Sequence, residues 1–270
     1  MTQPARDWRW TAYQMLGLAL TAALLLAVFE NTRLDVLLEL PFYDAALHDF
    51  PLRTHWFFSG VMHHGLKMTS YALGVVALGG CLYALRGQID WLPPRHALLA
   101  ACGMLLVPLV ISSLKHFTNR HCPWDVVDFG GFAPYVSLFS SNPPDIKPGA
   151  CFPAGHSAAG LAWLAWAFAL AGLDRRRSRL ALVAALAFGI VLGFGRMLQG
   201  AHFLSHTLWS VWFAWAICTV LAFLLRVPMR PQPVVAAVSQ PDSALPTISA
   251  TSGESPSVRD TRSNAARIDT

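Results

Sequence analysis

The stretch 195–206, GRMLQGAHFLSH, holds two kinds of side chain suited to phosphate chemistry. Arg196, His202 and His206 stand here within a short connection between two apolar runs. Arginine binds oxyanions through a planar fork of donors, and histidine can act as nucleophile, acid or base near neutral pH. At the edge of a membrane, this combination indicates chemistry on a phosphate group.

The composition predicts a membrane protein. Of 270 residues, 13% are charged and 54% are hydrophobic, and the mean hydropathy is +0.44. Apolar residues gather in six blocks without Asp, Glu, Lys or Arg, each close to the roughly 20 residues that cross a bilayer. The blocks are 11–29, 68–85, 97–114, 157–173, 180–195 and 207–225. We therefore expect an all-α polytopic protein with six transmembrane helices, the first a retained signal anchor.

Arginines in the connections predict the orientation. They lie before the first block and after the second, fourth and sixth, at Arg6, Arg9, Arg86, Arg95, Arg175, Arg176, Arg177, Arg179, Arg226 and Arg230. The positive-inside rule makes these connections cytoplasmic, with both termini inside, in a bacterial-type inner membrane. The net charge of +5 then reflects topology. Nucleic-acid binding is not expected, because the arginines are divided among separate connections.

The remaining segments differ in character. Segment 30–67 mixes apolar and charged residues and is expected to hold one or two interfacial helices. Segment 115–156 is rich in Gly and Pro, which predicts an irregular loop with a short helix near 124–129. Residues 1–226 form the expected membrane domain. Residues 227–270 are rich in Pro, Ser, Thr and Ala and are expected to be a disordered cytoplasmic tail.

Four chemically capable residues fall at block edges: Lys115, His156, Arg196 and His202. With alternating helix direction, all four lie on the external face. Two cations can hold a phosphoryl group while one histidine attacks phosphorus and the other protonates the leaving oxygen. The ordinary alternatives are helix-end cations that reach lipid head groups and histidines with structural hydrogen bonds.

These residues resemble the type 2 phosphatidic acid phosphatase (PAP2) superfamily. Its motifs are KxxxxxxRP, PSGH and SRxxxxxHxxxD. Here they read KHFTNRHCP at 115–123, PAGH at 153–156 and GRMLQGAHFLSH at 195–206, so spacing and order match over about 115–206.

The resemblance implies a membrane lipid phosphatase with a PAP2-like helical bundle, its core built from the last four spans. It makes His202 the nucleophile that forms a phosphohistidine and His156 the general acid. Lys115, Arg196 and the Gly155 backbone N–H become the phosphate ligands. It implies no cofactor and no metal. The substrate is a phosphate monoester or diphosphate of a membrane lipid, held at the periplasmic face.

Three positions depart from the motifs: Cys122 replaces an arginine, Ala154 a serine and His206 an aspartate. These departures leave a second class of function open, a catalytically degenerate binder or transporter of anionic lipids. A lipid phosphotransferase is a further alternative. The identity of the lipid is also open, among phosphatidic acid, phosphatidylglycerol phosphate, an isoprenyl diphosphate and a lipid A phosphate.

Nearby residues are candidates to replace what is missing. Arg120 is a candidate phosphate ligand in place of the motif arginine, and Asp125 or Asp128 is a candidate to orient His202 or His206. The two histidines also form an i, i+4 pair that could ligate a metal in a helix, although a third ligand is not evident and a metal is not expected.

The cysteines divide by location. Cys81, Cys102 and Cys218 lie inside apolar blocks, whereas Cys122 and Cys151 share the external loop. An oxidising exterior permits a disulfide there. Its closed loop of about 30 residues would stabilise the fold by about 3 to 4 kcal/mol in the chain-entropy model. We therefore expect this bridge, which would hold the first motif beside the second.

Overall fold

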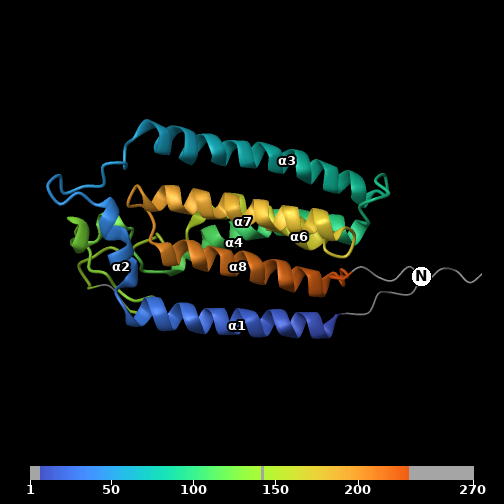
Figure 1. Ribbon diagram of the computed structural model, residues 1–270, viewed down its shortest axis with the longest axis horizontal. Coiled ribbons are helices and arrows are strands. Elements are labelled where there is room, and N and C mark those ends of the chain that lie inside the picture. The colour runs from blue at the N-terminus through green and yellow to red at the C-terminus, as the bar shows by residue number, and fades with distance from the viewer. Residues whose placement is uncertain (1–6, 141–142, 231–270) are drawn as a thin grey trace, which may run out of the picture. The chain divides into compact units, whose positions relative to one another are not determined.

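The computed structural model describes residues 7–140 and 143–230, which contain helices and no regular strand. Figure 1 shows long helices running side by side. The α-helices are α1 (Trp8–Asn31), α2 (Leu34–Glu39), α3 (Leu66–Leu85), α4 (Pro94–Leu114), α5 (Gly155–Leu161), α6 (Leu164–Leu170), α7 (Arg175–Met197) and α8 (Leu204–Leu224). The shorter turns are η1 (Leu40–Phe42), the π-helix η2 (Phe57–Gly65), η3 (Lys115–Phe117), η4 (Pro123–Asp125) and η5 (Val127–Phe129).

Five helices among the described residues are long and apolar enough to cross a membrane. They run over Trp8–Asn31, Phe57–Leu85, Pro94–Phe117, Arg175–Met197 and Leu204–Leu224. The protein is thus a multi-pass membrane protein with an all-helical fold. The expected count of six transmembrane helices is not confirmed, because the fourth apolar block forms two helices of 7 residues each, α5 and α6.

The interruption between α5 and α6 is a locally tightened turn. The N–H of Trp163 donates to the carbonyl of Gly160 at 3.2 Å, and the N–H of Trp166 donates to that of Trp163 at 3.1 Å. These i to i+3 bonds replace the α-helical pattern. Ser70 of α3 supports the turn from the side. Its hydroxyl donates to the carbonyl of Ala159 at 2.7 Å and accepts from Trp163 Nε1 at 2.9 Å.

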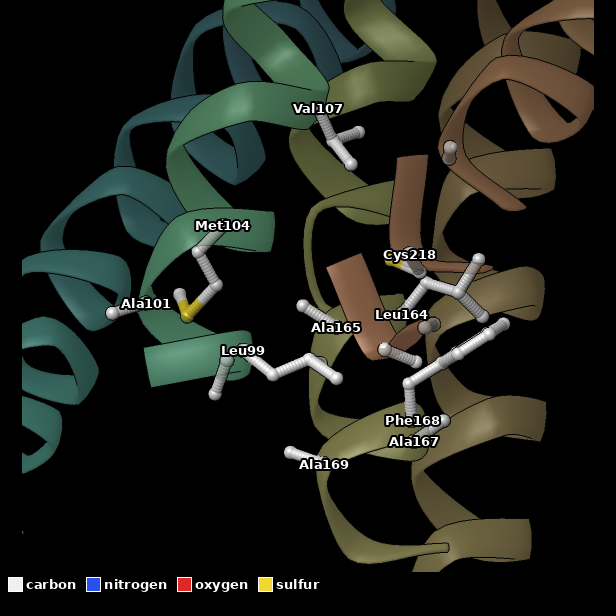
Figure 2. Packing of buried hydrophobic residues seen from close by; sticks show 14 of the residues in the cluster. Leu99, Ala101, Met104, Val107, Leu164, Ala165, Ala167, Phe168, Ala169 and Cys218 are labelled. Carbon is white, nitrogen blue, oxygen red and sulfur yellow. The ribbon is translucent and has the colours of Figure 1, made fainter. Parts of the chain in front are cut away.

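Small residues let the helices approach closely. A Cβ on Gly160 of α5 would lie 2.6 Å from the Gly189 nitrogen of α7, and one on Gly103 of α4 would lie 2.5 Å from the Ala165 Cβ of α6. Small side chains at such crossings allow van der Waals contact between backbones in a bilayer. Figure 2 shows part of the resulting core, in which Leu99 and Val107 face Leu164 and Cys218. This core holds together the helices that carry the motifs.

The motif-bearing ends of α4, α5, α7 and α8 gather at one end of the bundle, beside α2 and the connecting loops (Figure 1). A second apolar cluster, Val36, Phe50, Val126, Phe129 and Phe203, packs at this end. Segment 30–67 contributes α2, η1 and η2, and the expected short helix near 124–129 consists of two 3-10 turns, η4 and η5.

The chain remains packed slightly beyond the expected domain end at 226. Val227 is buried within the core cluster and Met229 packs against it. The described residues up to 230 belong to one compact unit. The expected disordered tail lies, from residue 231 onward, outside the described residues.

Candidate active site

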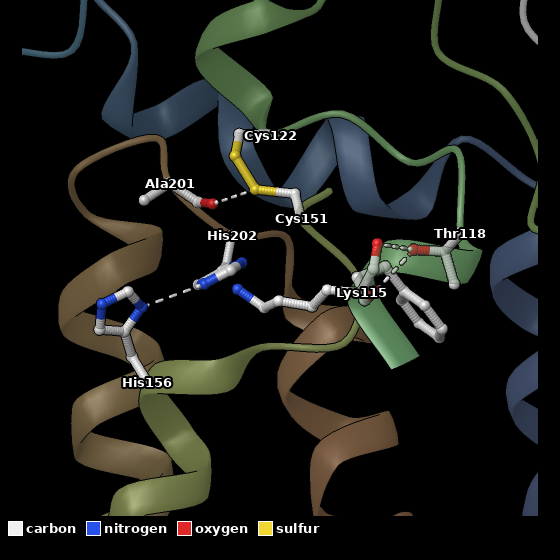
Figure 3. The surroundings of a disulfide bond; sticks show 8 residues. Lys115, Thr118, Cys122, Cys151, His156, Ala201 and His202 are labelled. Atoms are coloured by element: carbon white, nitrogen blue, oxygen red, sulfur yellow. Dashed lines mark hydrogen bonds between the residues drawn. A yellow bond between two sulfur atoms is a disulfide. The ribbon is translucent and has the colours of Figure 1, made fainter. Parts of the chain in front are cut away.

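Two motif histidines face each other at the start of α5 and just before α8. His156 Nδ1 lies 3.4 Å from His202 Nε2, and the ring centroids are 5.6 Å apart (Figure 3). His202 is 2% exposed. Gly200 stands two residues earlier, and its φ of +70° favours glycine. A Cβ built there would lie 2.4 Å from the Phe50 ring. The turn before His202 is therefore specified by glycine.

Lys115 extends into the space beside these histidines. Figure 3 shows its ammonium pointing toward His202. A Cβ built on Gly155 would lie 3.0 Å from Lys115 Cε and 3.2 Å from Nζ. The absence of a side chain at Gly155 thus gives the lysine its place. The end of α4 and the start of α5 meet at this contact.

Arg196 lies in the last turn of α7 and is held by neutral groups. Its Nη1 donates to Gln199 Oε1 at 2.8 Å, and its guanidinium carbon lies 5.5 Å from the centroid of the Trp124 ring. Gln199 is fixed in turn, because its Nε2 donates to the Arg53 carbonyl at 3.0 Å. Arg196 Nε is buried without a hydrogen-bond partner among the described residues. This donor remains available for an oxyanion.

A small cavity of about 10 Å³ joins His156 to Arg196. Its wall is formed by Phe58, Met62, Lys67, His156, Leu192, Gly195, Arg196 and Gln199. Met62 packs directly on the α7 backbone, since a Cβ on Gly195 would lie 2.7 Å from Met62 Cε. The space suits about one water. Entry of a phosphate group therefore requires the η2 side chains Phe58 and Met62 to shift.

Burial and the positive charge around His202 favour its neutral form, and the same positive charge favours binding of an anion. Burial, followed by the positive charge of Lys115, lowers the pKa of His202 well below its usual value. Within the described part of the chain, neither Lys115 nor Arg196 forms an ion pair with a carboxylate. Two unneutralised cations beside a neutral imidazole are suited to binding a phosphoryl group and attacking it.

Arg120, the candidate substitute for the motif arginine, is held elsewhere. It is 2% exposed, with Nη2 2.9 Å from Glu30 Oε1 and Nη1 3.7 Å from Asp35 Oδ2. Two carboxylates neutralise its charge, so we do not retain it as a phosphate ligand. Asp128 forms an ion pair with Arg33 at the surface.

The candidate orienting residues do not replace the motif aspartate directly. No hydrogen bond between the described side chains of Asp125 and His202 or His206 is present. His206 is fully buried and its ring centroid lies 5.8 Å from that of His202. It also packs edge-on against Phe152 and Phe203. The position that carries a carboxylate in the motif is thus an aromatic packing position here.

Cys122 and Cys151 are joined by a disulfide, with Cα atoms 5.2 Å apart and a separation of 29 positions in sequence (Figure 3). The N–H of Cys151 also donates to the Arg120 carbonyl at 3.0 Å, and the Thr118 hydroxyl donates to the Phe152 carbonyl at 2.7 Å. These links fix the end of the first motif against the segment that enters the second. Cys122 therefore has a structural role at the motif's arginine position.

Three residues of the types that can ligate a metal also lie together at this site. One ligand atom each from Cys151, His202 and His206 lies within 4.8 Å of the others. The Cys151 sulfur is bound in the disulfide, and Lys115 and Arg120 place positive charge next to the histidines. A dication would meet two cations without a thiolate to offset them, so we assign no metal to this grouping.

Residues outside the motifs complete the site. Gln199 and Trp124 hold Arg196, and η2 covers the cavity. Gln199 stands three residues after Arg196, which is a recognisable spacing for a contact within one helical turn. The aromatic and η2 contacts join segments far apart in sequence and carry no local signal.

Among solved structures, the chain is similar to a transmembrane PAP2-type phosphatidylglycerolphosphate phosphatase from Bacillus subtilis, with 20% identity and a TM-score of 0.44, over 80% of this chain and 94% of that one. No curated protein matches the chain. The family model of the PAP2 superfamily matches residues 96–229, which include Lys115, His156, Arg196 and His202. This chain belongs to the PAP2 superfamily.

Proposed function

We propose that this protein hydrolyses a phosphate monoester or diphosphate of a membrane lipid through a phosphohistidine intermediate. The observation that carries the proposal is the His156–His202 pair, 3.4 Å apart, beside the cations of Lys115 and Arg196. Membership of the PAP2 superfamily and the apolar helices support a phosphatase that works on lipids.

In the first step, the η2 side chains Phe58 and Met62 shift, the contact between His156 and His202 opens, and the substrate phosphoryl group enters the cavity beside Arg196. Lys115, Arg196 and the Gly155 N–H bind its non-bridging oxygens. The Nε2 lone pair of neutral His202 attacks phosphorus, forming the P–N bond as the bond to the lipid oxygen breaks. Protonated His156 gives its proton to that leaving oxygen, so no alkoxide or unprotonated phosphate is released.

In the second step, water replaces the lipid product. His156, now neutral, takes a proton from the water as its oxygen attacks phosphorus. The P–N bond breaks, inorganic phosphate leaves and both histidines return to their starting protonation states. The cations stabilise the charge that develops on the phosphoryl oxygens in both steps.

The orientation of the site is part of the proposal. Arg86, Arg95, Arg175 and Arg226 lie at helix ends opposite to those that carry the motifs. The positive-inside rule then places the site at the external face of an inner membrane. This placement favours lipids of the outer leaflet as substrates.

Release of phosphate from a panel of lipid phosphates in detergent micelles tests the function. We expect wild-type protein and His116→Ala to release phosphate, because His116 is exposed and lies outside the cavity. His202→Ala is expected to lose at least 10³-fold in kcat. Full activity of purified His202→Ala would contradict the mechanism. Binding of lipid phosphates without release by the wild type would favour the anionic-lipid binder, and transfer to a second lipid would favour the phosphotransferase.

A further inference from the structure

We propose that Asp35, in the short helix α2, is a positioning residue that fixes the start of α8 and thereby the nucleophile loop. The inference rests on the proposed function and adds to it a carboxylate from outside the motifs. Asp35 lies 61 residues before the start of the region that the family model matches, at residue 96. It occupies no position in the three motifs.

The carboxylate of Asp35 caps α8 from another helix. Phe203, the N-cap residue of α8, provides no side-chain cap. Asp35 Oδ1 instead accepts from the Ser205 N–H at 3.0 Å, and Oδ2 accepts from the Ser205 hydroxyl. An acidic group at a helix N-terminus satisfies free N–H groups and complements the helix dipole. Asp35 does this while fully buried.

Neutral donors and one positive charge surround the Asp35 carboxylate. Tyr135 donates its hydroxyl to Oδ2 at 3.3 Å, and Arg120 Nη1 lies 3.7 Å from the same oxygen. With Ser205, four donor groups converge on one carboxylate. Glu39, the other buried acid of α2, has a pKa raised by burial and by Asp35 to about 9. Glu39 is therefore neutral near pH 7. Burial also raises the pKa of Asp35, while the two hydrogen bonds from Ser205 and the charge of Arg120 oppose this shift and favour the carboxylate.

The capped turn is connected to both histidine loops. Ser205 stands between His202 and His206, and the His206 carbonyl accepts from the Ala154 N–H at 3.1 Å. Ser210 strengthens this connection, because its hydroxyl lies 3.1 Å from the Ala154 carbonyl and 2.8 Å from the His206 carbonyl. Ala154 precedes Gly155 and His156. Asp35 thus holds the turn whose backbone also bonds to the loop that carries the general acid, His156.

The arrangement accounts for the loss of the motif aspartate at His206. A motif carboxylate at that position would act on the nucleophile ring, whereas Asp35 acts one residue away on the backbone and hydroxyl of Ser205. The orientation of His202 then depends on the geometry of the α8 start. Arg120, which pairs with Asp35 and with Glu30 of α1, ties the same turn to the first transmembrane helix.

Asp35→Asn tests the proposal, and Glu39→Gln is the matched control. Both residues lie on α2 and both are fully buried. Glu39→Gln replaces a neutral carboxyl with a neutral amide and is expected to keep kcat within about twofold. Asp35→Asn removes the charge and one acceptor. We expect kcat to fall roughly ten- to hundredfold, with KM changed less than about threefold, because displacing a catalytic group by an ångström has effects of this size.

Folding is followed separately by thermal unfolding in the same detergent. If Asp35→Asn loses turnover only in proportion to its unfolded fraction, Asp35 is merely structural and the proposal is overturned. The same conclusion follows if folded Asp35→Asn turns over as Glu39→Gln does. Ser205→Ala keeps the N–H and provides a milder variant. The double variant Asp35→Asn/Ser205→Ala should lose less than the product of the two single effects, since both act on one contact.

A readout independent of turnover separates this inference from the proposed function. Diethyl pyrocarbonate modifies accessible neutral imidazoles, and mass spectrometry locates the adduct on His202. We expect slow modification in wild type and Glu39→Gln, where His202 is buried, and at least fivefold faster modification in folded Asp35→Asn. If no lipid phosphate is hydrolysed but this contrast remains, the proposed function fails and the positioning role stands. Equal modification rates in all three proteins would refute the positioning role.

Discussion

Gly155→Ala is a steric test of the place of Lys115 in the site. The added Cβ would lie 3.0 Å from Lys115 Cε and 3.2 Å from Nζ, which is closer than ordinary contact. The atoms met belong to the flexible end of a side chain, so the helix can form while the ammonium is displaced. Gly155 has no left-handed φ that would strain an alanine. The substitution therefore moves the charge and leaves the backbone unchanged.

The expected magnitude follows from losing one phosphate ligand. Removing a single preorganised donor from a charge-stabilising site reduces kcat by about 10² to 10³. Because Lys115 retracts and is not removed, we expect the lower end, a loss of about 100-fold in kcat/KM. This corresponds to about 2.7 kcal/mol of transition-state stabilisation.

The assay is steady-state phosphate release on any lipid phosphate that the wild type hydrolyses. Gly79→Ala is the control, because a Cβ there meets nothing within 4 Å. It should turn over as wild type and unfold at the same temperature or slightly higher. Adding Lys115→Ala to Gly155→Ala should reduce activity by less than Lys115→Ala does alone, since the two changes disturb one group. Wild-type kcat/KM in folded Gly155→Ala, or fully additive effects in the double variant, would refute the reasoning.

Three further predictions concern protonation, the disulfide and the interruption of the fourth apolar block. Because burial lowers the pKa of His202, the nucleophile stays neutral as pH falls through 6.5. After correction for substrate ionisation, kcat/KM should therefore fall on the acid side only well below pH 6.5. A fall in kcat/KM with an apparent pKa at or above 6.5 that belongs to the enzyme would contradict this. Reducing Cys122–Cys151 should lower the free energy of unfolding by about 3 to 4 kcal/mol in denaturant titrations, and an unchanged midpoint would count against the bridge. Ser70→Ala leaves Trp163 Nε1 without its acceptor and should cost about 1 to 3 kcal/mol, measured the same way. Ser59→Ala, which removes only a solvent-exposed hydrogen bond to the His55 carbonyl, should cost less than about 0.5 kcal/mol.

The sequence predicted the parts of the site that depend on helix ends. Four predicted site residues stand at the edges of apolar blocks: Lys115, His156, Arg196 and His202. Because successive helices run in opposite directions, the end of one block and the start of the next lie at the same end of the bundle. The structure places Lys115 beside Gly155 and His156 beside His202, as this reasoning requires. Hydrophobic runs are strong signals because a bilayer allows little other than helices.

Other features could not be predicted from local patterns. The interruption of the fourth apolar block lies in a uniformly apolar run, and it depends on contacts of Gly160 with α7 and of Ser70 with Trp163. Periodicity does not reveal such crossings. The ion pair of Arg120 with Glu30 joins residues 90 positions apart. Because of this ion pair, Arg120 is not available as a phosphate ligand. No spacing rule in the sequence would have indicated the pairing.

Trapping of the covalent intermediate tests the central claim most directly. Wild-type protein is mixed with a ³²P-labelled lipid phosphate, quenched within one turnover in base and digested for mapping. The account predicts an acid-labile, base-stable phosphoryl group on the peptide that contains His202, present in His156→Ala in larger amount and absent in His202→Ala. Turnover with no label on any histidine, or label that remains in His202→Ala, would contradict it.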